Sequence, residues 1–558
     1  MSEIVMEAKL NIGYRYYSCS ESQLKLVNHG RSLPRRGRIF SSSFTLTLPI
    51  IKSSTTSPIS KFSTLSPIIK FNTNFQCKRI SAVADKVDDQ ETFSTNSVAK
   101  LVAIVGGEST SPLKNVPWED VLIHTAAKLK WIDEGYNLHV LTESILTKQE
   151  KEAELVLAQT DILIIINVQH QDSVKWVLQN TEVIPTIVCF DCCPALQNKL
   201  GGLKVSNNNQ TMIEKFLPLG QGKQIKESLE VLRTVQEAWG RNNSDDIWFS
   251  LLLLINSYIR PVPVLQNLRA KGFSTLYCMI KNCRTQLVDC LLDPNCREAL
   301  VCLNKCAPTD QVCNYRCIAS YESPKFEAFS LCVLQKHNCL GLNAEIPVKP
   351  NVQPLSFFRG SPLTHEVAED LFVGWLGKLN SSWRVVAGQN PAYDQFPCQY
   401  QLFYRGKAKR TFWYEPVFQV KTLDGQLIWR RRRYRVKRED IPGTFIFTVL
   451  DNGVVSREFW RIVDVTDDLS WALFYYGGAA QAAGQSYRGA ILVTPDGIWP
   501  SKNEAQRINS ALERCGIKDW ELFGVDNTCC TNAPLGIPEG SSLHVTLQLR
   551  DSNVLSCE

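Results

Sequence analysis

The chain lacks acidic residues over a long stretch near its start. From Ser22 to Ala84 there is no Asp or Glu, whereas Ser and Thr fill 18 positions and Lys and Arg fill ten. A segment that is rich in hydroxyl groups, basic and free of acids is typical of an organellar transit peptide. The excess of Ser and Thr favours the chloroplast over the mitochondrion. We therefore predict a transit peptide or disordered segment over residues 1–95.

Long apolar runs are also missing. No run reaches the roughly 18–20 residues that a membrane-spanning helix requires. The longest candidate, Ile247–Ile255, is too short and is interrupted by Ser250. We expect a buried helix there.

The charge balance argues against a nucleic-acid partner. The net charge of +6 comes from the first 95 residues, which hold 13 basic and 7 acidic side chains, while the remainder holds 48 of each sign. A neutral body does not provide the basic surface that binds nucleic acid through bulk electrostatics. We expect no nucleic-acid binding.

Between residues 98 and 262, short branched apolar runs alternate with helix-like segments. The runs are Leu101–Val105, Asn137–Leu141, Asp161–Ile166 and Thr186–Phe190. Continuous apolar strands that alternate with helices indicate a parallel sheet covered on both faces. We predict a doubly wound α/β domain of unknown function over residues 98–262.

No nucleotide-binding motif accompanies this domain. The segment Gly106–Ser109 follows the first apolar run, where phosphate loops occur, but it matches neither G-x-G-x-x-G nor G-x-x-x-x-G-K-[ST]. We interpret its glycines as turn residues. Cys189 lies in the fourth run, and Cys192 and Cys193 follow it. A reactive thiol is conceivable there, and a buried core position is favoured for Cys189.

Cysteine is abundant in one segment, because ten residues of this type lie between positions 278 and 339. Cys302 and Cys306 are four apart, as are Cys313 and Cys317, so each pair lies on one face of a helix. Two such helices folded back on each other would pair Cys302 with Cys317 and Cys306 with Cys313.

The same segment lacks a Cys-x-x-Cys pair and holds one histidine, His337. Zinc binding is therefore disfavoured, and an even number of cysteines in a short segment fits a disulfide framework. We predict a disulfide-stapled α-helical module over residues 270–345, without a metal, in an oxidising compartment.

After a Pro-rich linker, alternating apolar runs are separated by turn signals. The runs are Trp383–Ala387, Cys398–Tyr404, Thr411–Val420, Gln426–Val436, Gly443–Leu450, Val454–Val463, Trp471–Tyr476 and Arg488–Thr494. Eight antiparallel strands close into a barrel that can hold one small ligand. We predict a lipocalin-like eight-stranded antiparallel β-barrel over residues 355–535, an outer helix at Ser501–Cys515, and a C-terminal tail over 536–558.

Four motifs carry a resemblance to a known family. They are Leu292–Cys296 (LDPNC), Leu303–Cys306 (LNKC), Asn390–Gln399 (NPAYDQFPCQ) and Asp526–Cys529 (DNTC). Together they resemble the plant violaxanthin de-epoxidase superfamily over about residues 270 to 535. With the α/β domain in front, the chain is similar to the violaxanthin de-epoxidase-related subgroup.

The resemblance implies six disulfides. Carried onto the matching positions, they are Cys278–Cys296, Cys283–Cys290, Cys302–Cys317, Cys306–Cys313, Cys332–Cys339 and Cys398–Cys529.

The resemblance also implies an activity. The family's barrel binds an epoxy-xanthophyll such as violaxanthin and reduces it, so we expect an oxidoreductase (or an isomerase) with ascorbate as co-substrate and no tightly bound cofactor. It implies a chloroplast location and peripheral contact with the thylakoid membrane. Lumen and stroma both stay open, because disulfides favour the lumen whereas no apolar signal region precedes Lys100.

Family positions suggest the site residues. Asp394, Glu458 and Tyr476 are expected to be catalytic, and the expected substrate-binding residues are Tyr393, Tyr434 and Tyr475. A buried carboxylic acid with a raised pKa can protonate an opening epoxide. A turn-capping role for Asp394 and a core role for Tyr476 stay open, and a solvated strand-edge position is favoured for Glu458.

Several positions depart from the family pattern, which leaves the reaction less defined than the fold. Pro397 replaces an aspartate and Val493 replaces a tyrosine. In Arg430–Arg433, strand alternation would turn two side chains inward, although a solvated rim is favoured for all four. Two other functions stay open, namely a non-catalytic lipocalin-type carrier or regulator for a carotenoid or another isoprenoid, and a redox-regulated interaction protein.

Overall fold

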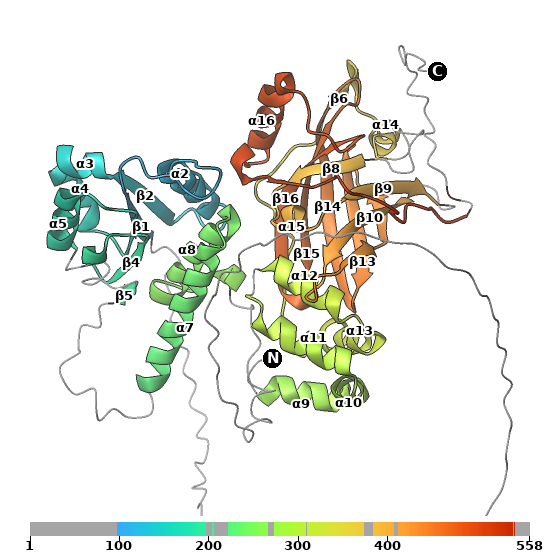
Figure 1. The fold of residues 1–558 in the computed structure, drawn as a ribbon, viewed down its shortest axis with the longest axis horizontal. Coiled ribbons are helices and arrows are strands. Elements are labelled where there is room, and N and C mark those ends of the chain that lie inside the picture. The colour runs from blue at the N-terminus through green and yellow to red at the C-terminus, as the bar shows by residue number, and fades with distance from the viewer. Residues whose placement is uncertain are drawn as a thin grey trace, which may run out of the picture. The chain divides into compact units, whose positions relative to one another are not determined.

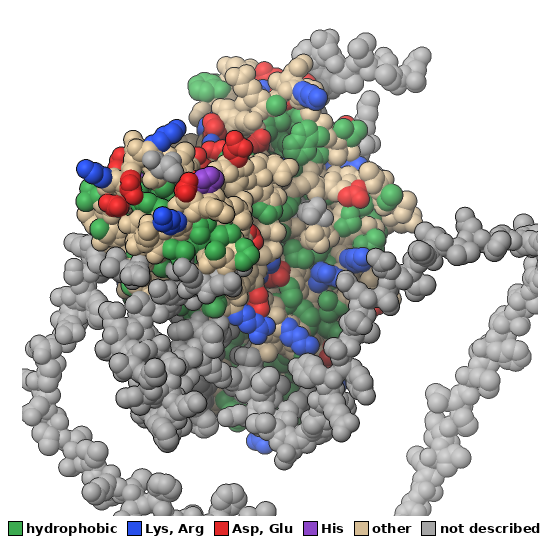
Figure 2. All heavy atoms as spheres, turned by 60° about the vertical axis from the view of Figure 1, so that its left-hand side comes forward, with side chains coloured by type: hydrophobic (Ala, Val, Ile, Leu, Met, Phe, Trp, Pro, Cys, Tyr) green, Lys and Arg blue, Asp and Glu red, His purple; other side chains and the backbone are tan. Residues whose placement is uncertain are grey.

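A computed structural model of the chain describes residues 98–181, 184–196, 203–205, 221–265, 273–307, 310–372, 383–406, 411–539 and 541 (Figure 1). The predicted transit peptide and most of the predicted C-terminal tail lie outside these residues. Among the helices that the structure describes, none has both the length and the hydropathy to cross a membrane. Figure 2 shows charges of both signs interspersed with apolar side chains over the described part of one face.

The first domain is built on one sheet. Its strands are β1 (Ala99–Val105), β2 (Tyr136–Thr142), β3 (Ile162–Ile166), β4 (Thr186–Phe190) and β5 (Leu203–Val205). Their order is β2-β1-β3-β4-β5; the first four are parallel and β5 is antiparallel to β4. The predicted parallel α/β sheet is confirmed, whereas the three-residue strand β5 is too short to give a periodic signal.

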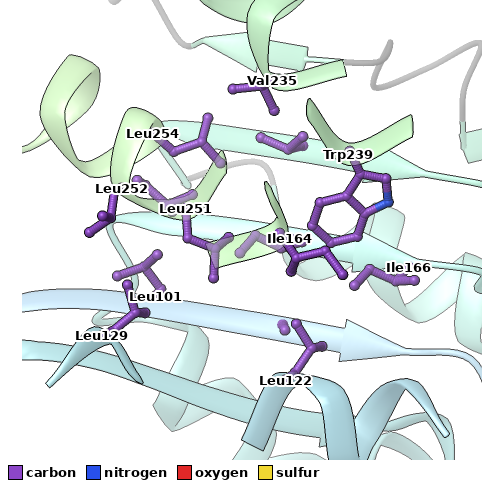
Figure 3. Packing of buried hydrophobic residues seen from close by; sticks show 14 of the residues in the cluster. Leu101, Leu122, Leu129, Ile164, Ile166, Val235, Trp239, Leu251, Leu252 and Leu254 are labelled. Carbon is purple, nitrogen blue, oxygen red and sulfur yellow. The ribbon is translucent and has the colours of Figure 1, made fainter. Parts of the chain in front are cut away.

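Helices cover both faces of this sheet. The helices on one face are α2 (Trp118–Leu129), α7 (Gln221–Gly240) and α8 (Ser244–Tyr258), and those on the other are α3 (Glu143–Lys148), α4 (Glu150–Leu157) and α5 (Gln171–Asn180). Figure 3 shows Leu122, Trp239 and Leu251 packed with Leu101 and Ile164 of the sheet. The predicted buried helix at Ile247–Ile255 is confirmed as part of α8.

The cysteine-rich module consists of short helices. They are α9 (Phe273–Asn282), α10 (Arg284–Leu292), α11 (Pro294–Lys305), α12 (Gln311–Ser320), α13 (Pro324–Ser330) and the π-helical turn η2 (Leu331–Lys336). Side-chain oxygens of Asp293, Asp310 and Ser323 accept hydrogen bonds from backbone N–H groups in the first turns of α11, α12 and α13. These N-caps explain why each helix begins where it does.

The nested pair of disulfides predicted from spacing is confirmed. Cys302 is bonded to Cys317 and Cys306 to Cys313, and these bonds join α11 to α12. A short connection between two helices that each carry cysteines four residues apart leaves little choice of partner.

The other four implied pairings are wrong. Cys278 is bonded to Cys339, Cys283 to Cys332, Cys290 to Cys296, and Cys398 to Cys530. The physical reason for the first two is that η2 folds back onto α9, which brings distant cysteines together. Cys290 then pairs locally across the α10–α11 turn. Cys529 carries a free thiol.

The third part is the barrel. Its strands are β8 (Trp383–Gly388), β9 (Tyr400–Arg405), β10 (Thr411–Lys421), β11 (Leu427–Arg431), β12 (Tyr434–Arg438), β13 (Thr444–Asp451), β14 (Val454–Val465), β15 (Ala472–Ala480) and β16 (Gln485–Thr494). Strand β8 pairs with both β16 and β9, which closes the barrel. β11 pairs with residues 417–421 of β10, and β12 pairs with residues 411–414 of the same strand. β11 and β12 therefore together take the place of one of the eight barrel strands. The predicted single strand Gln426–Val436 therefore breaks at Arg432 and Arg433.

Shorter elements complete the fold. They are β6 (Phe357–Phe358), β7 (Ser361–Pro362), α14 (His365–Asp370), α15 (Ala392–Gln395), α16 (Ala505–Arg514), β17 (Phe523–Gly524) and the 3-10 turns η1 (Pro263–Leu265), η3 (Gln481–Ala483), η4 (Lys502–Glu504) and η5 (Asp519–Glu521). Phe372, just after α14, packs inside the barrel among the rings of Phe403, Phe445 and Phe474. The predicted outer helix is confirmed, because α16 packs against the outward faces of β15 and β16. The predicted fold class is confirmed.

Candidate functional site

The candidate site is a carboxylic acid inside the barrel. Glu458 lies on β14 and is 6% exposed. Trp460, two residues further on, belongs to the interior cluster, while Phe459 between them packs with the residues under α16. Period-two alternation therefore turns Glu458 inward. The favoured solvated strand-edge position was wrong, because the side chain is buried inside the barrel and β14 has paired neighbours on both sides.

Two neighbours hold this carboxyl group. The indole Nε1 of Trp460 donates a hydrogen bond to Oε2 of Glu458 at 2.7 Å, and the hydroxyl of Tyr487 donates to Oε1 at 2.8 Å. Burial raises the pKa of Glu458 above its ordinary value of 4.5, and the two hydrogen bonds act in the opposite direction. The balance leaves an acid that keeps its proton to a higher pH than a solvated glutamate does.

Glycines make room for this arrangement. Gly478 on β15 lies between Glu458 and Tyr487 in the strand register. A Cβ added at Gly478 would lie 2.6 Å from the Tyr487 ring and 2.7 Å from Cγ of Glu458. A Cβ at Gly489 would likewise lie 2.7 Å from the hydroxyl of Tyr476. The rings of Tyr487 and Tyr476 occupy the space that a side chain at position 478 or 489 would need.

Two predicted tyrosines share this interior. Tyr476 is buried and its ring stacks on Trp460, with centroids 5.6 Å apart. Tyr434 is partly buried, and its ring lies 5.2 Å from that of Tyr414. Burial, followed by the negative charge of Glu458, raises the pKa of Tyr434 well above its ordinary value. The structure thus brings Glu458, Tyr476 and Tyr434 together.

The expectation for Tyr475 was wrong. Its side chain points out of the barrel, packs near Phe459 and lies in the cluster under α16, because successive residues of a strand face opposite sides. Burial raises its pKa to about 12. Tyr393 and Asp394 lie on α15, and their side chains are outside the described part of the chain.

The four consecutive arginines form two sets of ion pairs instead of a solvated rim. Arg430 and Arg432 pair with Glu322, which follows α12, and Arg432 also contacts Asp451. The odd-numbered arginines pair with a single buried carboxylate of β10, Glu415. The two sets lie on opposite faces, as strand alternation predicts. Their charges are balanced by acidic residues that are distant in the sequence.

Helix α12 of the cysteine-rich module contributes an aromatic residue next to the first set. The ring of Tyr315 lies 5.4 Å from Phe396 and 5.5 Å from Phe418. Burial raises the pKa of Tyr315 to about 12. The guanidinium of Arg316 donates to the carbonyls of Lys421 and Thr422 at the end of β10. The module therefore contacts the barrel through both rings and hydrogen bonds.

The thiols of the α/β domain lie elsewhere. Cys189 and Cys192 are buried in the core, which confirms the core interpretation of Cys189. Cys193 lines a surface pocket of about 580 Å³ between α5 and the segment after β4.

Gly106, which follows β1, is required by close packing, since an added Cβ would lie 2.0 Å from the carbonyl oxygen of Asn167.

Sequence reasoning missed Trp460, Tyr487 and Gly478. Tyr487 and Gly478 are neighbours of Glu458 only across the sheet, and the strand register is set by the turns between β14, β15 and β16. Trp460 was detectable, because residues two apart on a strand share a face.

A closed eight-stranded barrel with an inward acid and a stapled helical module defines a lipocalin-type domain. Residues 275–527 match the protein family described as "VDE lipocalin domain". Over this part, the chain is similar to the violaxanthin de-epoxidases.

Curated relatives match at low identity. The chloroplastic violaxanthin de-epoxidase of Spinacia oleracea is 24% identical over 272 residues, which cover 47% of this chain and 53% of that protein. The enzyme of Nicotiana tabacum is 24% identical over 312 residues, covering 55% and 60%. The chain therefore spans little more than half the length of these relatives.

Proposed function

We propose that the barrel binds an epoxy-xanthophyll such as violaxanthin and that Glu458 protonates the epoxide oxygen during its reduction. The observation that supports this most directly is the buried carboxyl group with a raised pKa, surrounded by aromatic side chains. An apolar interior suits a polyene, and a neutral acid within it can give its proton to the oxygen as the C–O bond breaks.

The proposed reaction balances without a bound metal or flavin. Conversion of an epoxide to a double bond, with the oxygen lost as water, takes up two electrons and two protons. Ascorbate, as co-substrate, would supply both electrons in becoming dehydroascorbate. Glu458 would deliver a proton at the oxygen, and Tyr476 and Tyr434 would orient the end ring of the substrate. Asp394 is the second candidate for acid–base chemistry.

We further propose a chloroplast location and peripheral contact with the thylakoid membrane. The names of the curated relatives, which are described as chloroplastic, support the first. Exposed apolar side chains on α9 and α10 support the second, since a lipid-soluble substrate must be taken from a membrane. These side chains are Tyr277, Ile280, Val288, Leu291 and Leu292.

The test is turnover by the full chain with violaxanthin and ascorbate between pH 5 and 7. For Glu458→Gln we expect a loss of about 10²-fold or more in turnover, with violaxanthin affinity within threefold of wild type. Glu439→Gln, at an exposed glutamate, is the matched control and should keep full activity. Equal turnover in Glu458→Gln and wild type would remove the proposed role of this acid.

A non-catalytic carotenoid carrier is the second candidate, and the stack of aromatic rings inside the barrel favours it. Binding of violaxanthin without turnover at any pH in this range would support the carrier and overturn the enzyme.

A further inference from the structure

The α/β domain carries a C-x-x-C motif at the carboxyl end of β4. Cys189 lies in the strand, Cys192 follows it, and both thiols are free. The chain bends at Asp191, whose φ of +50° lies in the left-handed region. The Cys192 thiol donates a hydrogen bond to the carbonyl of Ile165 at 3.4 Å, and Ile165 is the residue opposite Cys189 in the β3–β4 register. The bend therefore brings the two thiols together, and they share a hydrogen bond.

This hydrogen bond makes the two thiols chemically unequal. It lowers the pKa of Cys192, although burial acts in the opposite direction. It raises the pKa of Cys189, and burial adds to that rise. The thiolate is the attacking form in thiol–disulfide exchange, and C-x-x-C is a spacing that redox dithiols use. Cys192 is therefore the better nucleophile of the pair, and Cys189 is placed to attack it in turn.

A third thiol connects the buried pair with solvent. Cys193 is partly exposed and packs against the cluster that holds Cys189 and Cys192. It also lines the surface pocket of about 580 Å³ beside α5. Four other residues that line this pocket carry amide or ammonium groups, which suit a small polar molecule with carboxylates. They are Gln169, Gln171, Lys175 and Gln179.

We propose that Cys189, Cys192 and Cys193 form a redox site that reacts with a low-molecular-weight disulfide, RSSR, and stores the oxidation as a Cys189–Cys192 bond. The Cys193 thiolate attacks RSSR, which forms a Cys193–SR mixed disulfide and releases RS⁻. The Cys192 thiolate attacks the sulfur of the SR group, and Cys193 leaves as a thiolate. The Cys189 thiolate then attacks Sγ of Cys192, and the second RS⁻ leaves.

The exchange balances with RSSR as the oxidant. Cys189 and Cys192 lose two electrons, and RSSR is reduced to two RSH, which take up the two protons of the oxidised thiols. Cys193 is a free thiol before and after. The proposal does not depend on the proposed function, because these cysteines lie in the α/β domain and Glu458 lies in the barrel.

The test equilibrates the full chain with mixtures of reduced and oxidised glutathione, then unfolds it in N-ethylmaleimide to block every remaining thiol. Trypsin cleavage at Lys175 and Lys199 releases one peptide, residues 176–199, that contains all three cysteines. Mass spectrometry should find three maleimide groups under excess reduced glutathione. Under excess oxidised glutathione we expect an internal disulfide, with only Cys193 modified.

A second cleavage after Phe190 locates this disulfide, because a Cys189–Cys192 bond keeps the two fragments joined. Three maleimide groups under excess oxidised glutathione would overturn the proposal. Glutathione adducts without an internal bond would overturn it as well.

Two variants test the separate roles. In Cys193→Ser the entry thiol is lost, so the internal bond should form at least about tenfold more slowly. In Cys189→Ser the last attack cannot occur, so bound glutathione should accumulate in place of the internal bond. Cys529→Ser, at an exposed free thiol, is the matched control and should behave as wild type.

Circular dichroism checks that each variant is folded. An unchanged rate in folded Cys193→Ser would contradict the role of Cys193 as the entry thiol. The wild-type titration tests the Cys189–Cys192 pair whether or not the variants fold.

Discussion

The hydroxyl of Tyr487 on β16 reaches across Gly478 on β15 to donate a hydrogen bond to Glu458 on β14. The distance from Oη to Oε1 is 2.8 Å, and the ring occupies the space that a side chain at position 478 would need. Three neighbouring strands thus fix the orientation of one acid. The hydrogen bond from Tyr487 positions the carboxyl group, while burial raises its pKa.

The pKa of Glu458 predicts how stability depends on pH. The pKa of Glu458 in the folded state is raised above the ordinary value of 4.5. At pH values between 4.5 and this raised pKa, the folded state binds more protons than the unfolded state. The free energy of unfolding should therefore fall as the pH rises through this window. Glutamine does not titrate, so Glu458→Gln lacks this fall in unfolding free energy. The difference in Tm, wild type minus variant, should therefore be smaller at pH 7 than at pH 4. Parallel pH curves for the two proteins would contradict the raised pKa.

Gly478→Ala should disturb the site by steric conflict. The new Cβ would meet both the Tyr487 ring and Glu458, and overpacking of this kind costs about 1–3 kcal/mol. Urea unfolding measures the loss in free energy of unfolding. Gly524→Ala is the matched control, because nothing lies within 4 Å of the position of its added Cβ. If both substitutions lowered the free energy of unfolding equally, the loss would come from replacing a strand glycine and not from the contact with Tyr487 and Glu458.

Glu415→Gln should destabilise the outer wall of the barrel. The buried carboxylate accepts hydrogen bonds from Tyr404, Arg431 and Arg433, and its loss would leave the two guanidinium groups without their counter-charge. We expect a cost of about 3 kcal/mol, at the low end for a broken buried pair because Arg433 is half exposed. Glu439→Gln should change the free energy of unfolding by no more than about 0.5 kcal/mol.

Loop length should rank the disulfides of the module. Cys278–Cys339 closes a separation of 61 residues, whereas Cys290–Cys296 closes one of 6. In the chain-entropy account, this difference is worth about 2 kcal/mol of unfolding free energy. Paired Cys→Ser substitutions, compared by urea unfolding without reductant, should therefore cost more for the first bond. A reversed order would mean that local packing outweighs chain entropy.

The sequence alone determined what repeats or lies close along the chain. Apolar runs with a period of two predicted the barrel strands, and runs alternating with helices predicted the parallel sheet. Spacing of four on each side of a short connection predicted Cys302–Cys317 and Cys306–Cys313. Each of these inferences needs only local geometry, because the partners lie within one helix, one strand or one hairpin.

Only the tertiary structure decided which distant groups meet. Cys283 bonds to Cys332 because η2 returns to α9, and no spacing records that return. Glu458 is buried because its face of β14 lines the barrel interior, and it meets Tyr487 because the register places both beside Gly478. Strand alternation gives the face of a side chain but not its neighbours, since the register is set by turns, closure and packing of the whole barrel.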